Sequence, residues 1–106
     1  MKNHADTCKQ IIDFLNTCGH YAWANRTRRV RLGGKLVTFG KEGSSDIFAV
    51  LRGGRFLGVE VKTEKDVQRE KQKEFEREIK RVGAEYVLAR TFDEFVVKYG
   101  QLPKGV

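Results

Sequence analysis

The stretch GSSDIFAVLRGGRFLGVEVKTEK constrains the fold of this chain more than any other part of it. It holds two extended apolar segments, 46–52 and 55–62, joined by a double glycine, which is the pattern of a β-hairpin. Asp46 opens the first segment, and Glu60 and Lys62 lie inside the second. Burying such groups costs free energy unless they are paired, hydrogen-bonded or bound to a metal. We therefore expect the hairpin to carry a polar site.

Side chains alternate between the two faces of a strand, so the second segment separates its residues by type. In RFLGVEVK the aliphatic residues share one face, whereas Glu60 and Lys62 share the other face with Phe56. Across a hairpin, Asp46 falls opposite Glu60 only when the loop has an odd number of residues or the strand has a bulge. We therefore predict a three-residue loop, Arg52-Gly53-Gly54, or an equivalent bulge.

Two carboxylates and an amine at one place form a minimal site for hydrolysing phosphodiesters. Asp46 and Glu60 offer oxygen ligands to a divalent cation, and water and a substrate phosphate can complete its shell. Lys62 can orient an attacking water or neutralise charge on the phosphorane. In the alternative interpretation, Glu60 and Lys62 are solvent-facing residues on the open side of a sheet, because Glu-x-Lys is common by chance.

A long charged helix is predicted over 66–82, with Phe75, Ile79 and Val82 on its buried side. Gln72 lies three residues before Phe75 and seven before Ile79, so it shares that face and needs a polar partner. The active-site lysine or a carboxylate is one candidate for this partner, and the backbone is the other.

The remaining elements follow from periodicity and from glycine stops. We predict a helix over 5–18, extended segments in YAWANRTRRVRL and KLVTFG with a turn at the two glycines between them, a strand in AEYVLA and a last helix in TFDEFVVKYG. Thr91 and Glu94 have capping-box spacing for that last helix. This order, with the number of early strands left open, predicts an α/β fold in which helices flank a mixed sheet. We expect residues 1–106 to form one domain.

The charge of the chain favours a polyanionic partner. Lys and Arg number 21 against 14 Asp and Glu, which gives a formal net charge of +7 and is typical of nucleic-acid binding. No acid occurs from Tyr21 to Lys41, and the cations of that stretch are Arg26, Arg28, Arg29, Arg31, Lys35 and Lys41. We interpret it as a phosphate-contacting stretch, and the plainer alternative is a solvated basic surface. Ser44, Ser45 and Lys65 complete the candidate DNA contacts.

Cysteine and histidine give no further site. Cys8 and Cys18 fall on one predicted helix, about 15 Å apart at ~1.5 Å per residue, which is too far for a disulfide within the chain. His4 and His20 are isolated in the sequence, and no cluster of Cys and His with metal-ligand spacing is evident. No apolar run reaches the ~20 residues that span a bilayer, and the N-terminus lacks a signal-peptide core. We expect a cytoplasmic location and no membrane partner.

The ordered set GHYAWANRT, TFGKEGSSDI, GRFLGVEVK and QKEFEREIKRVGAEYVLAR resembles the PD-(D/E)XK nuclease superfamily. Within that superfamily it is most similar to the small stand-alone VRR-NUC nucleases common in phages, and the similarity covers nearly the whole chain. The resemblance implies a restriction-endonuclease-like fold with an α-β-β-β-α-β core. It also implies cleavage of DNA that depends on Mg²⁺ or Mn²⁺, in the cytoplasm of a bacterial host if the protein is phage-encoded.

The resemblance also implies roles for single residues. It places the motif D…E-x-K and the helix glutamine of the family on Asp46, Glu60, Lys62 and Gln72, with the carbonyl of Val61 as a backbone metal ligand.

An acid on the first helix often joins the metal site in these proteins. Alignment on GHYAW puts Asp6 there, although relatives usually carry Glu, and Asp13 is a rival one heptad further on. Ser45 stands where the superfamily name expects proline, which is often replaced. No literal Val-Arg-Arg is found where the family name suggests one.

The function expected from these observations is a metal-dependent DNA endonuclease, selective for branched or Holliday-junction-like DNA. Small relatives of this layout tend to be homodimers, and two sites on a two-fold dimer suit such a substrate. The candidate interfaces are YAWANRTRRVRL and the apolar residues of the last helix, which can instead cover the sheet of its own subunit.

Two alternative functions stay open. The first is a non-catalytic nucleic-acid-binding module that stacks bases on Tyr21, Trp23 or Phe39, aromatic residues that are more often core. Such a module gains nothing from bringing Asp46 and Glu60 together, because carboxylates repel phosphate. The second alternative is a nuclease that acts on RNA.

Overall fold

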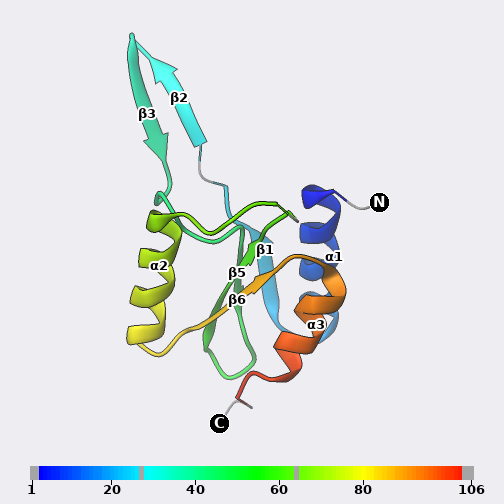
Figure 1. The fold of residues 1–106 in the computed structure, drawn as a ribbon. Coiled ribbons are helices and arrows are strands. Elements are labelled where there is room, and N and C mark those ends of the chain that lie inside the picture. The colour runs from blue at the N-terminus through cyan, green and yellow to red at the C-terminus, as the bar shows by residue number, and fades with distance from the viewer. Residues whose placement is uncertain (1–2, 27, 64, 104–106) are drawn as a thin grey trace.

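The structure, a computed structural model, describes residues 3–26, 28–63 and 65–103 (Figure 1). Its helices are α1 (His4–Thr17), α2 (Glu70–Arg81) and α3 (Phe92–Gly100). Its strands are β1 (Tyr21–Ala24), β2 (Arg28–Leu32), β3 (Lys35–Phe39), β4 (Ile47–Val50), β5 (Phe56–Val61) and β6 (Glu85–Ala89). None of the helices in this part of the chain is long and apolar enough to cross a membrane.

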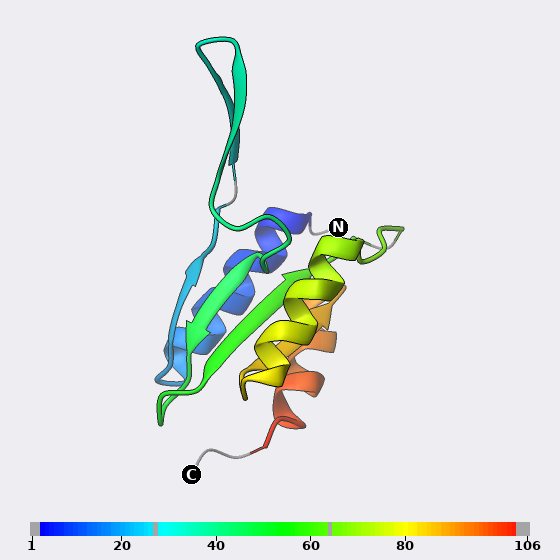
Figure 2. The same ribbon diagram turned by 90° about the vertical axis from the view of Figure 1, so that its left-hand side faces the viewer.

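The main sheet is mixed and has four strands in the order β1-β4-β5-β6. β1 pairs with β4 and β4 with β5 in antiparallel fashion, whereas β5 and β6 are parallel and α2 connects them. Helix α2 covers one face of the sheet, and α1 and α3 cover the other (Figures 1 and 2). This confirms the predicted α/β class, a mixed sheet flanked by helices.

The core lies between the sheet and the pair α1 and α3. Its largest fully buried apolar side chains are Ile11, Leu15, Ile47, Leu57, Val59 and Phe95. Phe14 of α1 makes edge-on ring contacts with Phe92, Phe95 and Tyr99 of α3, with centroids 5.4–6.1 Å apart. The apolar side of α3 therefore covers the sheet of its own subunit, so it does not provide the exposed interface that we considered.

The opposite face of the sheet packs against α2 through aromatic rings. Phe48 of β4 lies 5.1 Å from Phe56 of β5 and 6.4 Å from Phe75 of α2, measured between ring centroids. Phe75 also contacts Tyr86 of β6. Phe56 was predicted to share the strand face of Glu60, and Phe75 the helix face of Gln72. The packing of these rings holds α2 over that face of the sheet.

The β4–β5 hairpin has the predicted register. Ile47 pairs with Val59 and Val50 with Phe56, and the N–H of Leu51 donates to the carbonyl of Arg55 at 2.7 Å. The loop is therefore Arg52-Gly53-Gly54, in which both glycines have positive φ, 96° and 97°. Continuing the same register by one residue beyond Ile47 brings Asp46 opposite Glu60.

The segment YAWANRTRRVRL is divided between two sheets, and this adds a strand to the predicted order. β1 joins the main sheet, while β2 pairs only with β3 in a separate two-stranded hairpin. The division follows Asn25, whose N–H donates to the carbonyl of Asp46 at 2.8 Å. The Nδ2 amide of Asn25 also donates to Ser44 Oγ and to the carbonyl of Ser45. The backbone bond continues the β1–β4 register by one residue, and the side-chain bonds tie the chain after β1 to the segment before β4.

The β2–β3 hairpin projects from the body of the molecule (Figure 1). The turn between the strands is Gly33-Gly34, as predicted, with φ angles of 56° and 81°. Within the described residues this hairpin packs against no other helix or strand. It is therefore an arm that contributes nothing to the core.

Helix α2 begins at Glu70, four residues later than predicted. The preceding segment is held in another conformation, because Arg90 Nη1 donates to the carbonyls of Thr63 and Asp66. The side-chain oxygen of Gln72 accepts from the N–H of Arg69 at 2.8 Å, which caps the first turn at that point. Tertiary contacts thus override the helical preference of the charged residues that precede 70.

Helix α3 begins at the predicted cap. The hydroxyl of Thr91 accepts from the N–H of Glu94 at 3.0 Å. The Glu94 carboxylate accepts from the N–H of Arg90 instead of that of Thr91, so only half of the capping box forms.

Candidate active site

Four polar side chains from three segments meet at one end of the β4–β5 hairpin. Asp46 directly precedes β4, Glu60 lies in β5, Lys62 follows β5 and Gln72 lies in the first turn of α2. Glu60 Oε2 accepts from Gln72 Nε2 at 3.0 Å and lies 3.6 Å from Lys62 Nζ. Asp46 Oδ2 accepts from the N–H of Val61 at 2.8 Å. The structure therefore brings together the four residues that we predicted to be catalytic.

The burial of two of these residues excludes the interpretation that they face solvent. Glu60 is 2% exposed and Lys62 is 7% exposed. The polar partner that we expected for Gln72 is the Glu60 carboxylate, and its other amide atom is satisfied by the backbone of Arg69. Gln72 thus fixes Glu60 to the start of α2.

The surroundings of Glu60 disfavour its charged form. Burial, together with the neighbouring Asp46 carboxylate, raises the pKa of Glu60 to about 8 against the opposing effect of Lys62. Glu60 Oε1 is buried and has no hydrogen-bond partner among the described residues. Such an oxygen is costly unless it binds something. A divalent cation held by Asp46 and Glu60 would offset the repulsion between the two carboxylates and give Glu60 Oε1 a partner. The residues present therefore fit a metal ion.

Val61 enters this cluster through its N–H, which holds the Asp46 carboxylate in place. The role of its carbonyl as a metal ligand stays a prediction.

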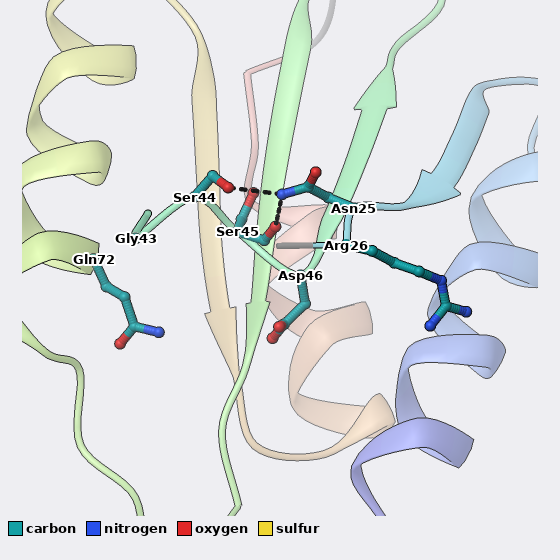
Figure 3. Close-up of a pocket in the computed structure, with 7 residues that line it drawn as sticks. All are labelled: Asn25, Arg26, Gly43, Ser44, Ser45, Asp46 and Gln72. Carbon is teal, nitrogen blue, oxygen red and sulfur yellow. Dashed lines mark hydrogen bonds between the residues drawn. The ribbon is translucent and has the colours of Figure 1, made fainter. Parts of the chain in front are cut away.

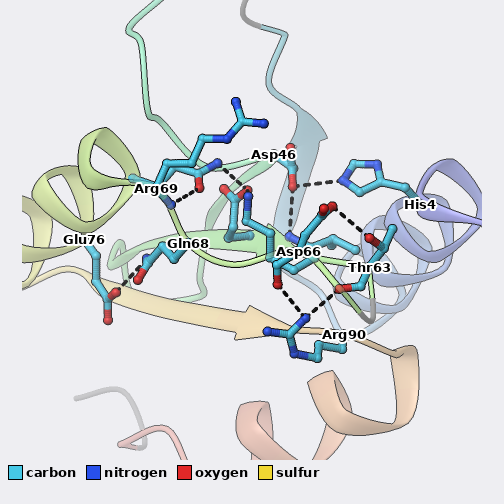
Figure 4. A network of polar contacts seen from close by, with 12 residues as sticks. His4, Asp46, Thr63, Asp66, Gln68, Arg69, Glu76 and Arg90 are labelled. Atoms are coloured by element: carbon cyan, nitrogen blue, oxygen red, sulfur yellow. Dashed lines mark hydrogen bonds and ion pairs between the residues drawn. The ribbon is translucent and has the colours of Figure 1, made fainter.

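His4, which sequence reasoning treated as isolated, also reaches the site. It begins α1, and its Nε2 lies 3.2 Å from Asp46 Oδ2 (Figure 4). Its Nδ1 lies 3.8 Å from Cys8 Sγ. His4, Cys8 and Asp46 each offer a ligand atom, and these atoms lie within 4.8 Å of one another. The sequence analysis did not predict that His4, Cys8 and Asp46 meet. The only signal for it in the sequence was the i, i+4 spacing of His4 and Cys8, with His4 one residue before the helix predicted over 5–18.

The structure does not place Asp6 or Asp13 in this cluster. Asp6 is exposed, and at ~100° per residue it is turned about 200° around the helix from His4. Asp13 is exposed too, and pairs with Lys9 at 2.9 Å. On α1 the position near Asp46 belongs to His4.

His20 makes hydrogen-bond contacts with Arg52 and Tyr99, and neither cysteine forms a disulfide. His20 Nδ1 accepts from the N–H of Arg52 at 2.9 Å, and its Nε2 lies 2.6 Å from the Tyr99 hydroxyl oxygen. Cys8 and Cys18 are free thiols, as predicted.

An open pocket of about 500 Å³ lies beside the site (Figure 3). It is lined by Asn25, Arg26, Gly43, Ser44, Ser45, Asp46 and Gln72. Asp46 and Gln72 thus share one hollow with Arg26 and Ser44, two of the candidate DNA contacts. An anionic substrate in this pocket would lie directly against Asp46.

Ser45 has a supporting role that the sequence did not indicate. It is 1% exposed, and its hydroxyl donates to the carbonyl of Ile47 at 3.1 Å. A Cβ atom on Gly58 of the neighbouring strand would lie 2.7 Å from Ser45 Oγ. The absence of a side chain at Gly58 therefore leaves room for Ser45, which sets the position of Asp46. Its buried hydroxyl is not available as a DNA contact.

The remaining candidate DNA contacts lie on and around the hairpin arm. Arg29, Arg31 and Lys35 are exposed on the arm, and the side chain of Arg28 lies outside the described residues. Arg29 pairs with Glu42 at 3.3 Å. Lys41 is exposed after β3, and Lys65 is exposed in the segment before α2.

Comparisons of the chain with protein-family models, with curated proteins and with solved structures find no match. The case for a function is therefore made from the geometry of this site and from the charge around it.

Proposed function

We propose that the protein is a divalent-metal-dependent endodeoxyribonuclease that hydrolyses phosphodiester bonds. The observation that carries the proposal is the buried Glu60 carboxylate with one unpartnered oxygen beside Asp46. A lysine lies 3.6 Å away, and a glutamine fixes the second oxygen. An unpartnered carboxylate oxygen is costly in a buried position, and a bound cation would give it a partner.

The arrangement of elements supports a restriction-endonuclease-like fold. Without the arm, the order α1-β1-β4-β5-α2-β6 follows the α-β-β-β-α-β core of that fold, with α3 added at the end. The four candidate residues lie at the hairpin of two central strands and at the start of the helix that connects them to β6, which supports this proposal.

Each residue has a distinct task in the proposed reaction. Asp46 and Glu60 would hold the cation, which when bound would neutralise phosphate charge and lower the pKa of a water molecule. Lys62, next to Glu60, would orient the attacking water and stabilise negative charge that develops on the phosphate. Gln72 keeps Glu60 in position by its 3.0 Å hydrogen bond.

The surroundings of the site favour an anionic polymer as substrate. The net charge is +7, and Arg26 lines the pocket next to Asp46. Helices α1 and α2 both begin at this end of the molecule (Figure 1), so their N-terminal dipoles attract phosphate. The arm adds Arg29, Arg31 and Lys35, which lie far enough out to contact DNA beyond the cleavage point.

We also propose that the protein acts as a homodimer, as branched DNA requires two cuts on opposed strands. Of the two interfaces considered, the exposed edge strand β1 is the better supported, because Tyr21 is 69% and Trp23 is 39% exposed there. Sedimentation velocity at micromolar concentration tests this. Changing Tyr21 and Trp23 to serine should give monomers. A monomeric wild-type protein would contradict the proposed dimer but not the proposed nuclease activity.

A nucleic-acid-binding module without catalysis is the second candidate. The exposure of Tyr21, Trp23 and Phe39 favours it, since exposed aromatic rings can stack on bases. It does not account for the Asp46–Glu60 pair, which repels phosphate.

A cleavage assay decides between these functions. Supercoiled DNA, linear DNA, a four-way junction and an RNA of matched sequence are incubated with the protein in Mg²⁺, in Mn²⁺ and in EDTA. We expect metal-dependent cleavage of DNA, fastest on the junction, and none in EDTA. Binding without cleavage in either metal would support the binding module, and cleavage of RNA alone would change the substrate class.

A further inference from the structure

We propose that His4 is a third protein ligand of the metal centre, and that it makes the site prefer Mn²⁺ and other transition metals to Mg²⁺. This inference rests on the proposed function, because it takes Asp46 and Glu60 as the carboxylate ligands. It adds a nitrogen ligand from α1, at a place where an acid was expected.

The spacing of the two ligand atoms supports this role. His4 Nε2 and Asp46 Oδ2 lie 3.2 Å apart (Figure 4). Neighbouring ligands of an octahedral ion with bonds of ~2.1 Å lie about 3 Å apart. The imidazole and the carboxylate are within hydrogen-bond distance of each other, and the same spacing suits two ligands of one ion.

The helix holds His4 at the site. Asn3 caps α1 by accepting from the N–H of Asp6 at 2.8 Å, and Thr7, Ile11 and Leu15 are buried against the sheet. His4 lies three residues before Thr7 and seven before Ile11, on the same face. Its side chain is 44% exposed, so an ion can reach it without any change in the helix.

Cys8 is placed to orient the ring and not to share the ion. The two ring nitrogens of a histidine point in different directions, and Cys8 Sγ lies near Nδ1 while Asp46 lies near Nε2. When Nε2 binds an ion, Nδ1 carries the proton and donates to Cys8 Sγ. Histidine ligands usually have such a partner on the second nitrogen.

The chemistry of this ligand set determines the metal preference. Mg²⁺ prefers oxygen ligands and retains several waters, whereas imidazole suits transition metals. Mn²⁺ accepts both carboxylate and imidazole. An oxygen-only site made from Asp46 and Glu60 would not discriminate in this way.

The test measures metal binding directly, without substrate. Mn²⁺ binding is followed by the loss of the free-ion EPR signal, and Mg²⁺ binding by calorimetry. The variants are His4→Gln, Asp46→Asn, Cys8→Ser and the matched control Asp6→Asn on the same helix turn. Circular dichroism checks that each variant is folded.

We expect His4→Gln to weaken Mn²⁺ binding about tenfold or more and Mg²⁺ binding less than about threefold. Asp46→Asn should weaken both, Cys8→Ser should weaken Mn²⁺ binding by less than His4→Gln does, and Asp6→Asn should change neither. Pulsed EPR of bound Mn²⁺ should show coupling to a nitrogen nucleus that His4→Gln removes.

Unchanged Mn²⁺ affinity and no nitrogen coupling would overturn the role of His4. If Asp46→Asn still abolishes binding in that case, the carboxylate centre and the proposed function stand. A wild-type protein that binds neither metal would instead overturn the centre itself.

Discussion

Glu60 is the residue on which the site depends most. It is buried, and its two carboxylate oxygens differ: one is held by Gln72 and lies near Lys62, and the other has no partner among the described residues. Without a cation, an ionised Glu60 is repelled by the neighbouring Asp46 carboxylate. The metal-free protein should therefore be less stable whenever Glu60 is ionised.

The stability of the metal-free protein should fall as pH rises towards 8. The pKa of Glu60 is raised from 4.5 to about 8 in the folded state, so the folded protein binds this proton more tightly than the unfolded one. The resulting stabilisation is complete below about pH 4.5 and is lost as pH rises through about 8. Glu60→Gln should remove this dependence and, at pH 8 in EDTA, be more stable than wild type by ~1 kcal/mol or more.

Urea unfolding between pH 5 and pH 9 measures this effect. The control is Glu74→Gln, which changes an exposed glutamate of α2 and should keep the pH dependence of the wild type. A Glu60→Gln protein with the same pH dependence as wild type would show that Glu60 is not the group responsible.

Gly58 is constrained by Ser45 across the strand pair. In Gly58→Ala the new Cβ would lie 2.7 Å from Ser45 Oγ and 3.3 Å from Ile79 Cδ1. We expect destabilisation by about 1–3 kcal/mol, typical of overpacking, measured by urea unfolding. Gly100→Ala is the matched control, because a Cβ there meets nothing within 4 Å. Equal stability of the two variants would contradict the close approach of Ser45.

The sequence predicted the positions of some residues of the site but not of others. Glu60 and Lys62 were predictable because the period of a strand places them on one face, and Asp46 because the parity of the loop places it opposite Glu60. His4 was not predictable, because its contact with Asp46 joins residues 42 positions apart and depends on how α1 packs on the sheet.

At the scale of elements, the arm formed by β2 and β3 is separate from the rest of the fold. Its register puts Arg29 opposite Thr38 and Arg31 opposite Leu36 on one face, and Val30 opposite Val37 on the other. Isolated two-stranded hairpins are only marginally stable in water. The second face also carries Leu32 and Lys35, so cations lie on both faces of the arm, which suits contact with a polyanion such as DNA.

Replacing Arg29 and Arg31 by serine should weaken DNA binding for all sequences and reduce its salt dependence. Each lost phosphate contact lowers the slope of log K against log salt by ~0.9, so the slope should fall by up to about 2. Binding at several salt concentrations, measured by fluorescence anisotropy, checks this. Serine at Arg77 and Arg81, which are exposed on α2, removes the same charge as a control. Unchanged slopes in the arm variant would move the binding surface to Lys65, Arg69 and Lys73.

Element boundaries were predictable where local residues set them and not where distant ones did. Gly33-Gly34 and the Thr91 cap lie where local sequence predicts them. The link from β1 to the arm is held by the Asn25 side chain, which bonds to Ser44 and Ser45, and the late start of α2 depends on Arg90 bonding to the segment before it. Contacts of this kind join parts of the chain that no local pattern connects.

At the scale of the whole molecule, the features that point to phosphodiester chemistry gather at one end (Figures 1 and 4). The starts of α1 and α2, the residues around the end of β5 and the base of the arm all lie there. The opposite end carries the Arg52-Gly53-Gly54 loop, which has no candidate site residue. The residues proposed for binding and for catalysis therefore lie at the same end of the molecule.

Nicking of supercoiled plasmid in Mn²⁺ under single-turnover conditions, compared between wild type and Glu60→Gln, tests the central claim most directly. Loss of one carboxylate ligand should cost several kcal/mol of transition-state stabilisation, so we expect the nicking rate to fall about a thousandfold or more. The variant should remain folded by circular dichroism, and wild type in EDTA should give the same low background. Nicking by a folded Glu60→Gln protein within about tenfold of the wild-type rate would contradict the claim that this site cuts DNA.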